Sequence, residues 1–297
     1  MKTFALALAA SLCLASAGLA APQPPRLFEH SHMVVGPRIS VEVVGQGPDL
    51  VFIPGLASSR ETWKVTAERL RAHYRLHLIE VAGFAGEPAR ANATGPVFVP
   101  TVEAIDAYIV SQHLAPATVV GHSLGGTMAL WLAEHHPEHL KKVMLVDALP
   151  FVSTVFVSPT ATLAQATAVA EHIRTGPPQP EASLVKMTDS LVTGPADQAM
   201  VLGWGKISDG NTVRNALADD MELDLRPGLS AITTPITLVY PFSPAMGVPV
   251  KAWDGFYAAA YAAAPSVKLE RVDDSRHFIM LDQPATFAAD LDAFLAG

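Results

Sequence analysis

The sequence contains a single cysteine among its 297 residues, Cys13. One cysteine excludes an internal disulfide framework and any metal site built from several thiolates. Cys13 also lies in an apolar stretch that we interpret below as a removable leader. The folded chain is therefore expected to depend on its hydrophobic core alone, and 50% hydrophobic residues in a chain of this length can build a large one.

Charged residues are also scarce, at 16%, and the formal net charge is −8. No run of lysine and arginine is present, so nucleic acid is not expected as a partner. The sequence contains no Walker loop, no dinucleotide-binding fingerprint and no cluster of ligand residues at metal spacing. We therefore expect an enzyme without cofactor or metal, or a binding protein, acting on a small molecule.

Residues Met1 to Ala20 have the pattern of a secretory signal peptide. Lys2 supplies the positive end, Phe4 to Ala17 is apolar, and Gly18-Leu19-Ala20 provides the small residues that a signal peptidase reads. An uncleaved membrane anchor would need a longer apolar run. The pattern predicts export to the periplasm or the extracellular space, with no membrane span in the mature chain.

Short apolar runs alternate with helical patterns along much of the chain. This alternation predicts a mostly parallel sheet covered by helices on both faces. Residues 28–35 and 38–44 are expected to form an antiparallel pair at one edge. The other predicted strands are 49–53, 75–81, 118–120, 142–147, 236–240 and 267–272. From 149 to 228 the alternation stops, and four helical stretches are expected at 160–174, 181–192, 195–207 and 211–225.

The strand ending at Val120 leads into Gly121-His122-Ser123-Leu124-Gly125-Gly126, and a helical pattern follows at once. Small residues two positions before and after the serine allow strand and helix to approach closely around a strained turn. The helix N-terminus behind the serine favours developing negative charge. The motif indicates a nucleophilic serine at Ser123, against the alternative of an ordinary glycine-rich turn.

At these residues the sequence resembles the α/β-hydrolase family, because GHSLGG is similar to the nucleophile elbow of that family. The resemblance implies an eight-stranded, mostly parallel sheet with a helical cap inserted after the sixth strand. Together with the signal peptide predicted at 1–20, it implies a core at 21–150 and 229–297 and a cap at 151–228. The fold alone does not specify the substrate.

A serine hydroxyl needs a base to become an effective nucleophile, and the sequence offers eleven histidines. His277 follows the last predicted strand and precedes the final helix, which matches the place of the general base in the resembled family. The alternative is a surface histidine in a polar loop. The cluster His135, His136 and His139 straddles Pro137 at a helix end, and we expect no metal site there because the proline breaks the shared helical face.

The position of the acid that orients the histidine departs from the usual pattern of the resembled family. It commonly follows the strand before the last, but residues 241–249 contain no carboxylate. Some members place it one strand earlier, where Asp147 ends the strand 142–147. Asp147 is therefore the expected acid, with Asp254, Asp273 and Asp274 as alternatives. A dyad without an acid, or an Asp147 that only caps a turn, stays open.

The oxyanion intermediate requires two backbone N–H donors. We expect one from Leu124, directly after the serine, and the other from Leu56 in the turn Pro54-Gly55-Leu56. This turn resembles the family's His-Gly-x turn with proline in place of histidine. The longer glycine-rich version is absent, which disfavours the carboxylesterases that accept bulky tertiary alcohols.

Taken together, these features predict a serine hydrolase that cleaves carboxylic esters through an acyl-enzyme, with a small-molecule ester as its partner. Lactone or amide hydrolysis by the same residues is an alternative, and so is a catalytically weak binding protein on a hydrolase scaffold. The sequence specifies neither the oligomeric state nor the ester. Four apolar residues of the predicted cap are expected to form the core of the cap, with the lining of a substrate pocket as the alternative: Phe156, Met187, Met200 and Trp204.

Overall fold

The computed structural model describes residues 25–177 and 180–297, so the predicted signal peptide at Met1–Ala20 lies outside the described residues. One eight-stranded sheet organises the chain, in the spatial order β1-β2-β4-β3-β5-β6-β7-β8. The strands are β1 (His32–Val35), β2 (Ile39–Gly45), β3 (Asp49–Ile53), β4 (Arg75–Val81), β5 (Ala117–His122), β6 (Leu140–Val146), β7 (Ile236–Phe242) and β8 (Val267–Asp273).

The first two strands form the antiparallel edge of this sheet. β1 pairs with β2 and β2 pairs with β4 in antiparallel fashion, whereas every pairing from β4 to β8 is parallel. The prediction of an eight-stranded, mostly parallel sheet is confirmed. Because the carboxyl ends of parallel strands share one edge, the loops after β3, β5, β6 and β8 come together there.

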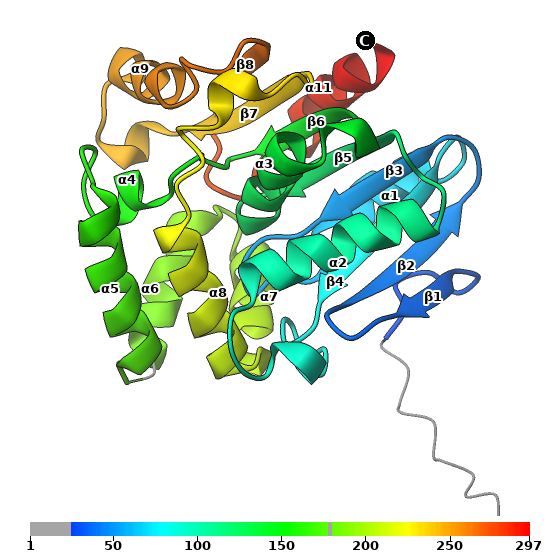
Figure 1. The fold of residues 1–297 in the computed structure, drawn as a ribbon, viewed down its shortest axis with the longest axis horizontal. Helices are drawn as coiled ribbons and strands as arrows, with labels where there is room; N and C mark the ends of the chain where they lie inside the picture. The colour runs from blue at the N-terminus through cyan, green and yellow to red at the C-terminus, as the bar shows by residue number, and fades with distance from the viewer. Residues whose placement is uncertain (1–24, 178–179) are drawn as a thin grey trace, which may run out of the picture.

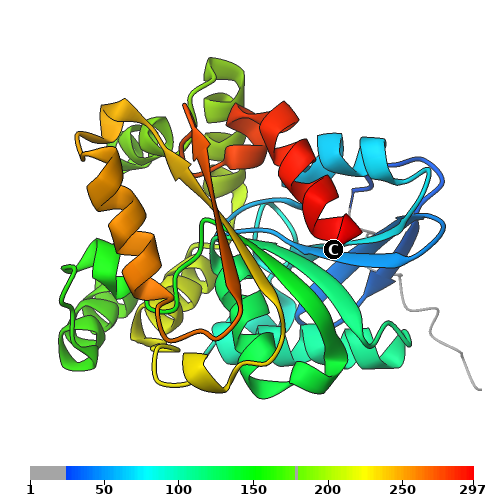
Figure 2. The same cartoon turned by 90° about the horizontal axis from the view of Figure 1, so that it is seen from above.

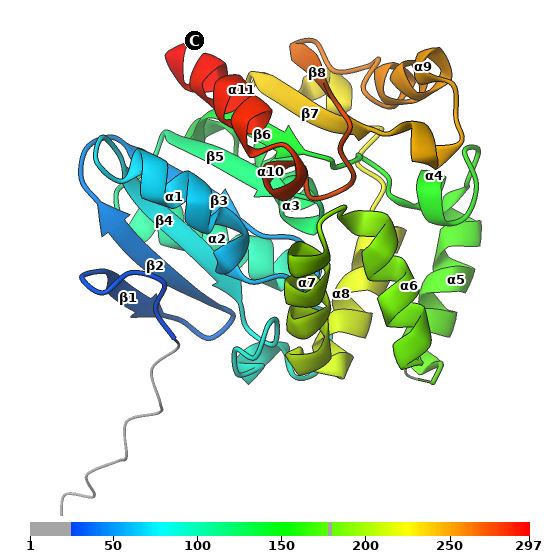
Figure 3. The same ribbon diagram turned by 180° about the vertical axis from the view of Figure 1, so that it is seen from behind.

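Helices cover both faces of the sheet, as Figures 1 and 3 show from opposite sides. One face packs against α2 (Phe98–Ser111), α3 (Leu124–His135) and α9 (Val250–Ala260). The other packs against α1 (Lys64–Leu70), α10 (Ile279–Asp282) and α11 (Pro284–Ala296). Figure 2 shows the twisted strands between the red α11 and the blue-green α2.

The alternation of side chains along β3 explains why both faces are apolar. Val51 and Ile53 contribute to the core on the α2 and α3 side, while Leu50 and Phe52 contribute to the core on the α1 and α11 side. Successive residues of a strand point to opposite faces, so a strand buried on both must be apolar throughout. The continuous apolar runs seen in the sequence are the direct consequence.

Between β6 and β7 the described residues form helices and no strand, which confirms the predicted helical insertion after the sixth strand. The α-helices are α4 (Ser153–Phe156), α5 (Leu163–Thr175), α6 (Glu181–Leu191), α7 (Pro195–Ile207) and α8 (Gly210–Glu222), and the short 3-10 helix η4 (Leu229–Ala231) follows them. α5 packs against α8 and α6 packs against α7, so the insertion consists of two helix pairs (Figure 3). We call these four helices, α5 to α8, the cap.

The four apolar residues that the sequence predicted for the cap divide into two groups, and one of them, Phe156, lies in α4, ahead of the four cap helices. Trp204 is buried, and Met200 packs against the same apolar cluster. In contrast, Phe156 is 61% exposed and Met187 is 51% exposed. The interpretation of these last two as cap core is therefore wrong: helical spacing identifies an apolar face but not whether another element covers it. Among the described residues, none of the helices is both long and apolar enough to cross a bilayer.

The contact between the cap and α3 contains a buried carboxyl group. Asp220 of α8 is 5% exposed, and its Oδ1 atom has no hydrogen-bond partner. Burial raises the pKa of Asp220 to about 7, and the Thr127 hydroxyl of α3 opposes this rise only in part. The folded state therefore binds a proton that the unfolded chain releases at lower pH.

This difference predicts a pH-dependent stability that Asp220→Asn removes. Between the unfolded pKa near 3.8 and the folded pKa of about 7, the free energy of unfolding should fall as pH rises. From pH 5 to pH 8 the wild-type protein should lose at most about 2–3 kcal/mol relative to Asp220→Asn, at ~1.4 kcal/mol per pKa unit. Urea unfolding at both pH values measures this difference.

Asp224→Asn is the matched control, because the Asp224 carboxylate forms a 2.6 Å ion pair with Arg226 and is less deeply placed. That variant should keep the wild-type pH trend. Parallel pH profiles for the wild-type protein and Asp220→Asn would show that Asp220 is ionised throughout this range in the folded state.

Candidate active site

Ser123 occupies a strained turn at the carboxyl end of β5. Its backbone dihedral angles are φ 53° and ψ −123°, a region that a residue with a side chain rarely adopts. The Ser123 N–H donates to the carbonyl of Val146 on the neighbouring β6, at 2.9 Å, and α3 begins at the next residue. The turn thus directs the hydroxyl away from the sheet, at the N-terminus of a twelve-residue helix.

The glycines around Ser123 permit this turn because no side chain would fit. A Cβ atom on Gly121 would lie 2.1 Å from the carbonyl oxygen of Gly125. A Cβ on Gly125 would lie 2.5 Å from the carbonyl oxygens of Ile53 and Pro54, so α3 abuts the end of β3 at this point. The close approach inferred from the GHSLGG motif is present in the structure.

His277 and Asp147 meet at the same edge of the sheet. Asp147 directly follows β6, and His277 lies four residues after the end of β8. The Nδ1 atom of His277 is 2.6 Å from Oδ2 of Asp147. Both side chains are largely buried, with 23% and 13% exposure, so the bond is shielded from water on most sides. This contact fixes one ring nitrogen of His277 and leaves Nε2 facing elsewhere.

The alternative acids lie in other interactions. Asp254 accepts a hydrogen bond from Tyr240 and pairs with Arg271, which also pairs with Asp273. The carbonyl of Asp274 accepts from Gln283, and its backbone adopts a positive φ of 55°. Of the four candidate carboxylates, the structure brings Asp147 alone to the ring of His277.

His277 lies beside His122, the residue before Ser123, and no direct hydrogen bond joins His277 to Ser123 in the described part of the chain. The ring of His277 lies 4.6 Å, centre to centre, from the ring of His122, the residue before Ser123. Within the described part of the chain, neither the Ser123 hydroxyl nor Nε2 of His277 has a hydrogen-bond partner. Catalytic hydrogen bonds in empty sites often form only when substrate binds, so both groups are available for a shared proton.

The two expected oxyanion donors also stand at this edge. Leu124 is the first residue of α3, where helix geometry leaves its N–H without an intrahelical acceptor. Leu56 follows Gly55, whose Cβ position would lie 3.1 Å from Cβ of Ser123. The turn at 54–56 therefore packs directly against the serine, as two donors for one oxyanion require.

His122 has a structural role: it connects the end of β5 to the loop that carries His277. It is fully buried, and its Nε2 donates to the backbone carbonyl of His277 at 3.0 Å. Burial lowers the pKa of His122 well below its ordinary value, and the neighbouring His277 adds to the effect. His122 is therefore neutral and ties the serine strand to the loop that carries His277.

The cap is attached to the same loop. The Phe278 N–H donates to the carbonyl of Leu191 at 3.1 Å, and the Arg276 guanidinium donates to the carbonyl of Val192 at 3.1 Å. Asp282 accepts from the backbone N–H of Thr193 at 2.8 Å and of Arg276 at 2.7 Å. The turn between α6 and α7 and the loop after β8 therefore hold one another.

Tyr257 of α9 is a site residue that sequence reasoning missed. Its hydroxyl donates to Oδ1 of Asp147 at 2.5 Å, so both oxygens of this carboxylate are occupied. Tyr257 is 2% exposed and stacks on Tyr240 with ring centres 4.4 Å apart. Burial, with Asp147 as the next cause, raises the pKa of Tyr257 well above its ordinary value. The hydroxyl therefore keeps its proton and acts as a donor.

This arrangement contains the parts of a nucleophilic hydrolase: a strained hydroxyl, an imidazole oriented by a carboxylate, and free N–H groups at a helix N-terminus. Within the residues that the structure describes, the one group of side chains spaced for a metal ion lies elsewhere, at Asp106, His136 and His139.

Comparison with known proteins agrees with this geometry. A model described as the alpha/beta hydrolase family matches residues 50–290. The pimeloyl-[acyl-carrier protein] methyl ester esterase of Aeromonas salmonicida is 37% identical over 112 residues, 38% of this chain and 42% of that protein. The protein of the same name from Nitrosomonas europaea is 26% identical over 215 residues, 68% of this chain and 79% of that one.

Solved structures extend the likeness over most of the chain. The enol-lactonase from Burkholderia xenovorans LB400 superimposes with a TM-score of 0.70 at 18% identity, covering 87% of this chain and 96% of that one. At this identity the likeness concerns the fold alone. The chain spans about two fifths of the first curated relative it matches, at 42% of its length.

The hydrogen bond from Tyr257 to Asp147 predicts a measurable change in Tyr257→Phe. Without this donor, Oδ1 of Asp147 loses its partner, and the carboxylate is less firmly held against His277. We expect kcat for a short nitrophenyl ester to fall about 10-fold, since ~1.4 kcal/mol corresponds to that factor.

Tyr240→Phe is the control, because the Tyr240 hydroxyl donates to Asp254 instead of Asp147. It should leave kcat near the wild-type value. A kcat near the wild-type value in Tyr257→Phe as well would contradict a positioning role for Tyr257.

Proposed function

Since the chain belongs to the alpha/beta hydrolase family, we propose that it is a serine hydrolase that cleaves carboxylic esters through an acyl-enzyme. The observation that carries the proposal is the 2.6 Å contact between His277 and Asp147 at the edge where Ser123 emerges. A serine, a histidine and an aspartate on three neighbouring loops form a catalytic triad, in which the imidazole accepts the serine proton and the carboxylate orients the imidazole.

In this mechanism the Ser123 oxygen attacks the ester carbonyl while its proton passes to Nε2 of His277. Asp147 holds the proton on Nδ1 and stabilises the imidazolium that forms. The N–H groups of Leu56 and Leu124 donate to the oxyanion. His277 then returns its proton to the departing alcohol, and a water molecule repeats the sequence to release the acid.

The relatives and the shape of the oxyanion turn support an ester with a small alcohol group. Both curated relatives carry the name methyl ester esterase. The turn Pro54-Gly55-Leu56 has one glycine and packs closely on the serine, since a Cβ on Gly55 would lie 3.1 Å from Cβ of Ser123; this short turn disfavours a bulky tertiary alcohol. Methyl and ethyl esters are therefore the proposed substrates, with lactones or amides as related acyl groups that the same residues would attack.

The alternative of an inactive binding protein was based on the absence of a carboxylate after β7. Asp147 occupies the corresponding place on the His277 ring from β6, so the absence no longer indicates a defective site. The proposal of an active enzyme is favoured for this reason.

Hydrolysis of short nitrophenyl esters by Ser123→Ala and Asp147→Asn tests the proposal. We expect the first variant to lose at least about 10³-fold in kcat and the second about 10²–10⁴-fold, as removal of triad residues does in other serine hydrolases. A fluorophosphonate probe should label the wild-type protein at Ser123. Asp273→Asn is the control, since its carboxylate pairs with Arg271 near the surface, and it should remain active. Equal rates for wild type and Ser123→Ala would end the proposal.

We further propose that the protein is exported to the periplasm or the extracellular space after removal of Met1–Ala20. The support is the sequence pattern of Lys2, an apolar run and small residues before Ala21. Expression of the full chain in a Gram-negative host, followed by cell fractionation and N-terminal sequencing, should yield a product that starts at Ala21. A chain without residues 1–20 should stay in the cytoplasm. Recovery of the uncleaved chain from the cytoplasm would contradict export.

A further inference from the structure

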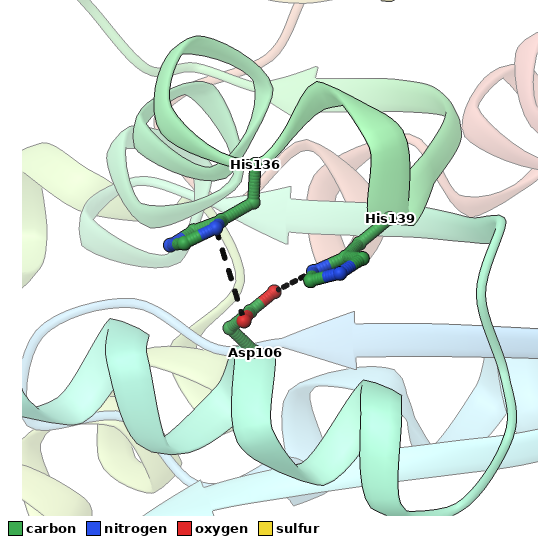
Figure 4. A group of neighbouring side chains, drawn as sticks. All are labelled: Asp106, His136 and His139. Atoms are coloured by element: carbon green, nitrogen blue, oxygen red, sulfur yellow. Dashed lines mark hydrogen bonds and ion pairs between the residues drawn. The ribbon is translucent and has the colours of Figure 1, made fainter.

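A second group of functional side chains lies at the opposite edge of the sheet from Ser123. Asp106 of α2, His136 at the end of α3, and His139 in the 3-10 helix η3 (Pro137–His139) point toward one another (Figure 4). Each residue offers one ligand atom, and these atoms all lie within 4.8 Å of one another. η3 precedes β6, so this group is at the amino ends of the strands, whereas the proposed active site is at the carboxyl ends.

The local helix type explains why the two histidines share a side despite Pro137. The His139 N–H donates to the carbonyl of His136 at 3.0 Å, which makes one turn of 3-10 helix. Residues three apart eclipse one another in such a turn. The argument from α-helical spacing, which predicted no shared face here, was therefore wrong for this pair.

The two histidines lie around the Asp106 carboxylate, with one ring nearest to each of its oxygens. Nδ1 of His139 is 2.7 Å from Oδ1, and Nδ1 of His136 is 4.0 Å from Oδ2. The two ring centres are 5.6 Å apart and the rings are nearly parallel, with 7° between their planes. Both imidazoles thus direct the same type of nitrogen toward the same carboxylate.

The charge around this group favours a cation. The Asp106 side chain is only 14% exposed, and in the described portion of the chain no lysine or arginine pairs with it. Glu138 adds a second carboxylate, with Oε1 3.8 Å from Nδ1 of His136 and 3.7 Å from Nε2 of His139. The carbonyl end of α3, which closes at His136, contributes further negative potential.

We propose that Asp106, His136 and His139 bind a divalent transition-metal ion, with Zn²⁺ as the ion that fits the donor set. Two imidazole nitrogens and one carboxylate oxygen are ordinary zinc ligands, with Glu138 or water in the fourth position. Bonds of ~2.1 Å in a tetrahedral site place ligand atoms ~3.4 Å apart. The observed nitrogen-to-oxygen distances of 2.7 and 4.0 Å lie on either side of this value, so small side-chain rotations suffice.

The metal would act on stability and not on catalysis. It would join α2 to the connection between α3 and β6, elements that are otherwise held by apolar packing and by the hydrogen bond between Asp106 and His139. A chain whose single cysteine is Cys13 has no disulfide to provide such a link. Ester hydrolysis at Ser123 should therefore proceed at the same rate with and without the ion.

Calorimetric titration of EDTA-treated, dialysed protein with ZnCl₂ at pH 7.5 tests the proposal. We expect one equivalent to bind with a micromolar or tighter Kd, and a 100-fold excess over Kd to raise the Tm by about 3–6 °C. With Cu²⁺ as the probe, electron paramagnetic resonance should show two nitrogen ligands.

The variants separate this site from other histidines. Asp106→Asn and His139→Ala should each weaken zinc binding at least about 10-fold and abolish the Tm increase. His135→Ala is the matched control, since its ring stacks on Trp131 and bonds to that residue's carbonyl, and it should bind zinc as the wild type does. Absence of binding to the wild-type protein, or undiminished binding to Asp106→Asn and His139→Ala, would overturn the proposal.

Discussion

The close approach of α3 to the end of β3 is the constraint on which the site depends. A Cβ atom on Gly125 would lie 2.5 Å from the carbonyl oxygens of Ile53 and Pro54. A Cβ atom on Gly121 would lie closer still, 2.1 Å from the carbonyl oxygen of Gly125. Because no side chain fits, the turn between β5 and α3 is short and Ser123 takes a positive φ. The same contact sets the turn at 54–56 against the serine, so one packing arrangement positions both the nucleophile and the donors proposed for the oxyanion.

Backbone strain marks this whole edge of the sheet. Among the described non-glycine residues with positive φ, five follow the carboxyl ends of β3, β4, β5, β6 and β8, in that order: Ala57, Ala85, Ser123, Asp147 and Asp274. Such conformations cost about 1–3 kcal/mol each and persist only where the surroundings impose them. Here they let each loop leave its strand sharply and return over the sheet, which brings side chains from distant loops to one place.

Because the proposed acid, Asp147, follows β6, the role of β7 and α9 is to hold that carboxylate in place. The loop after β7 contains no carboxylate, but the carbonyl of Pro241 accepts a 2.5 Å hydrogen bond from the Trp253 indole, which anchors α9. Anchored α9 then presents Tyr257 to Oδ1 of Asp147. In the proposed mechanism β7 and α9 thus support the acid, which itself directly follows β6.

The sequence was informative wherever the determining interactions are local. Alternating apolar runs predicted the sheet, the helical insertion and the strand ends, and the GHSLGG motif located the turn at Ser123. Asp147 was one candidate of four, because its contact with His277 joins residues 130 positions apart. Tyr257, His122 and Asp220 could not be identified, since each acquires its environment from a segment far away in the sequence. Helix type mattered too: His136 and His139 share a side only because η3 is a 3-10 turn.

The loop carrying His277 illustrates how the core and the cap act on one residue. From the core, His122 donates to the His277 carbonyl, and Asp147 accepts from its ring. From the cap, the carbonyls of Leu191 and Val192 accept from the residues on either side of it. A displacement of the turn between α6 and α7 would therefore move the histidine as well. The turn between α6 and α7 is consequently linked by hydrogen bonds to the loop that carries the proposed base, His277.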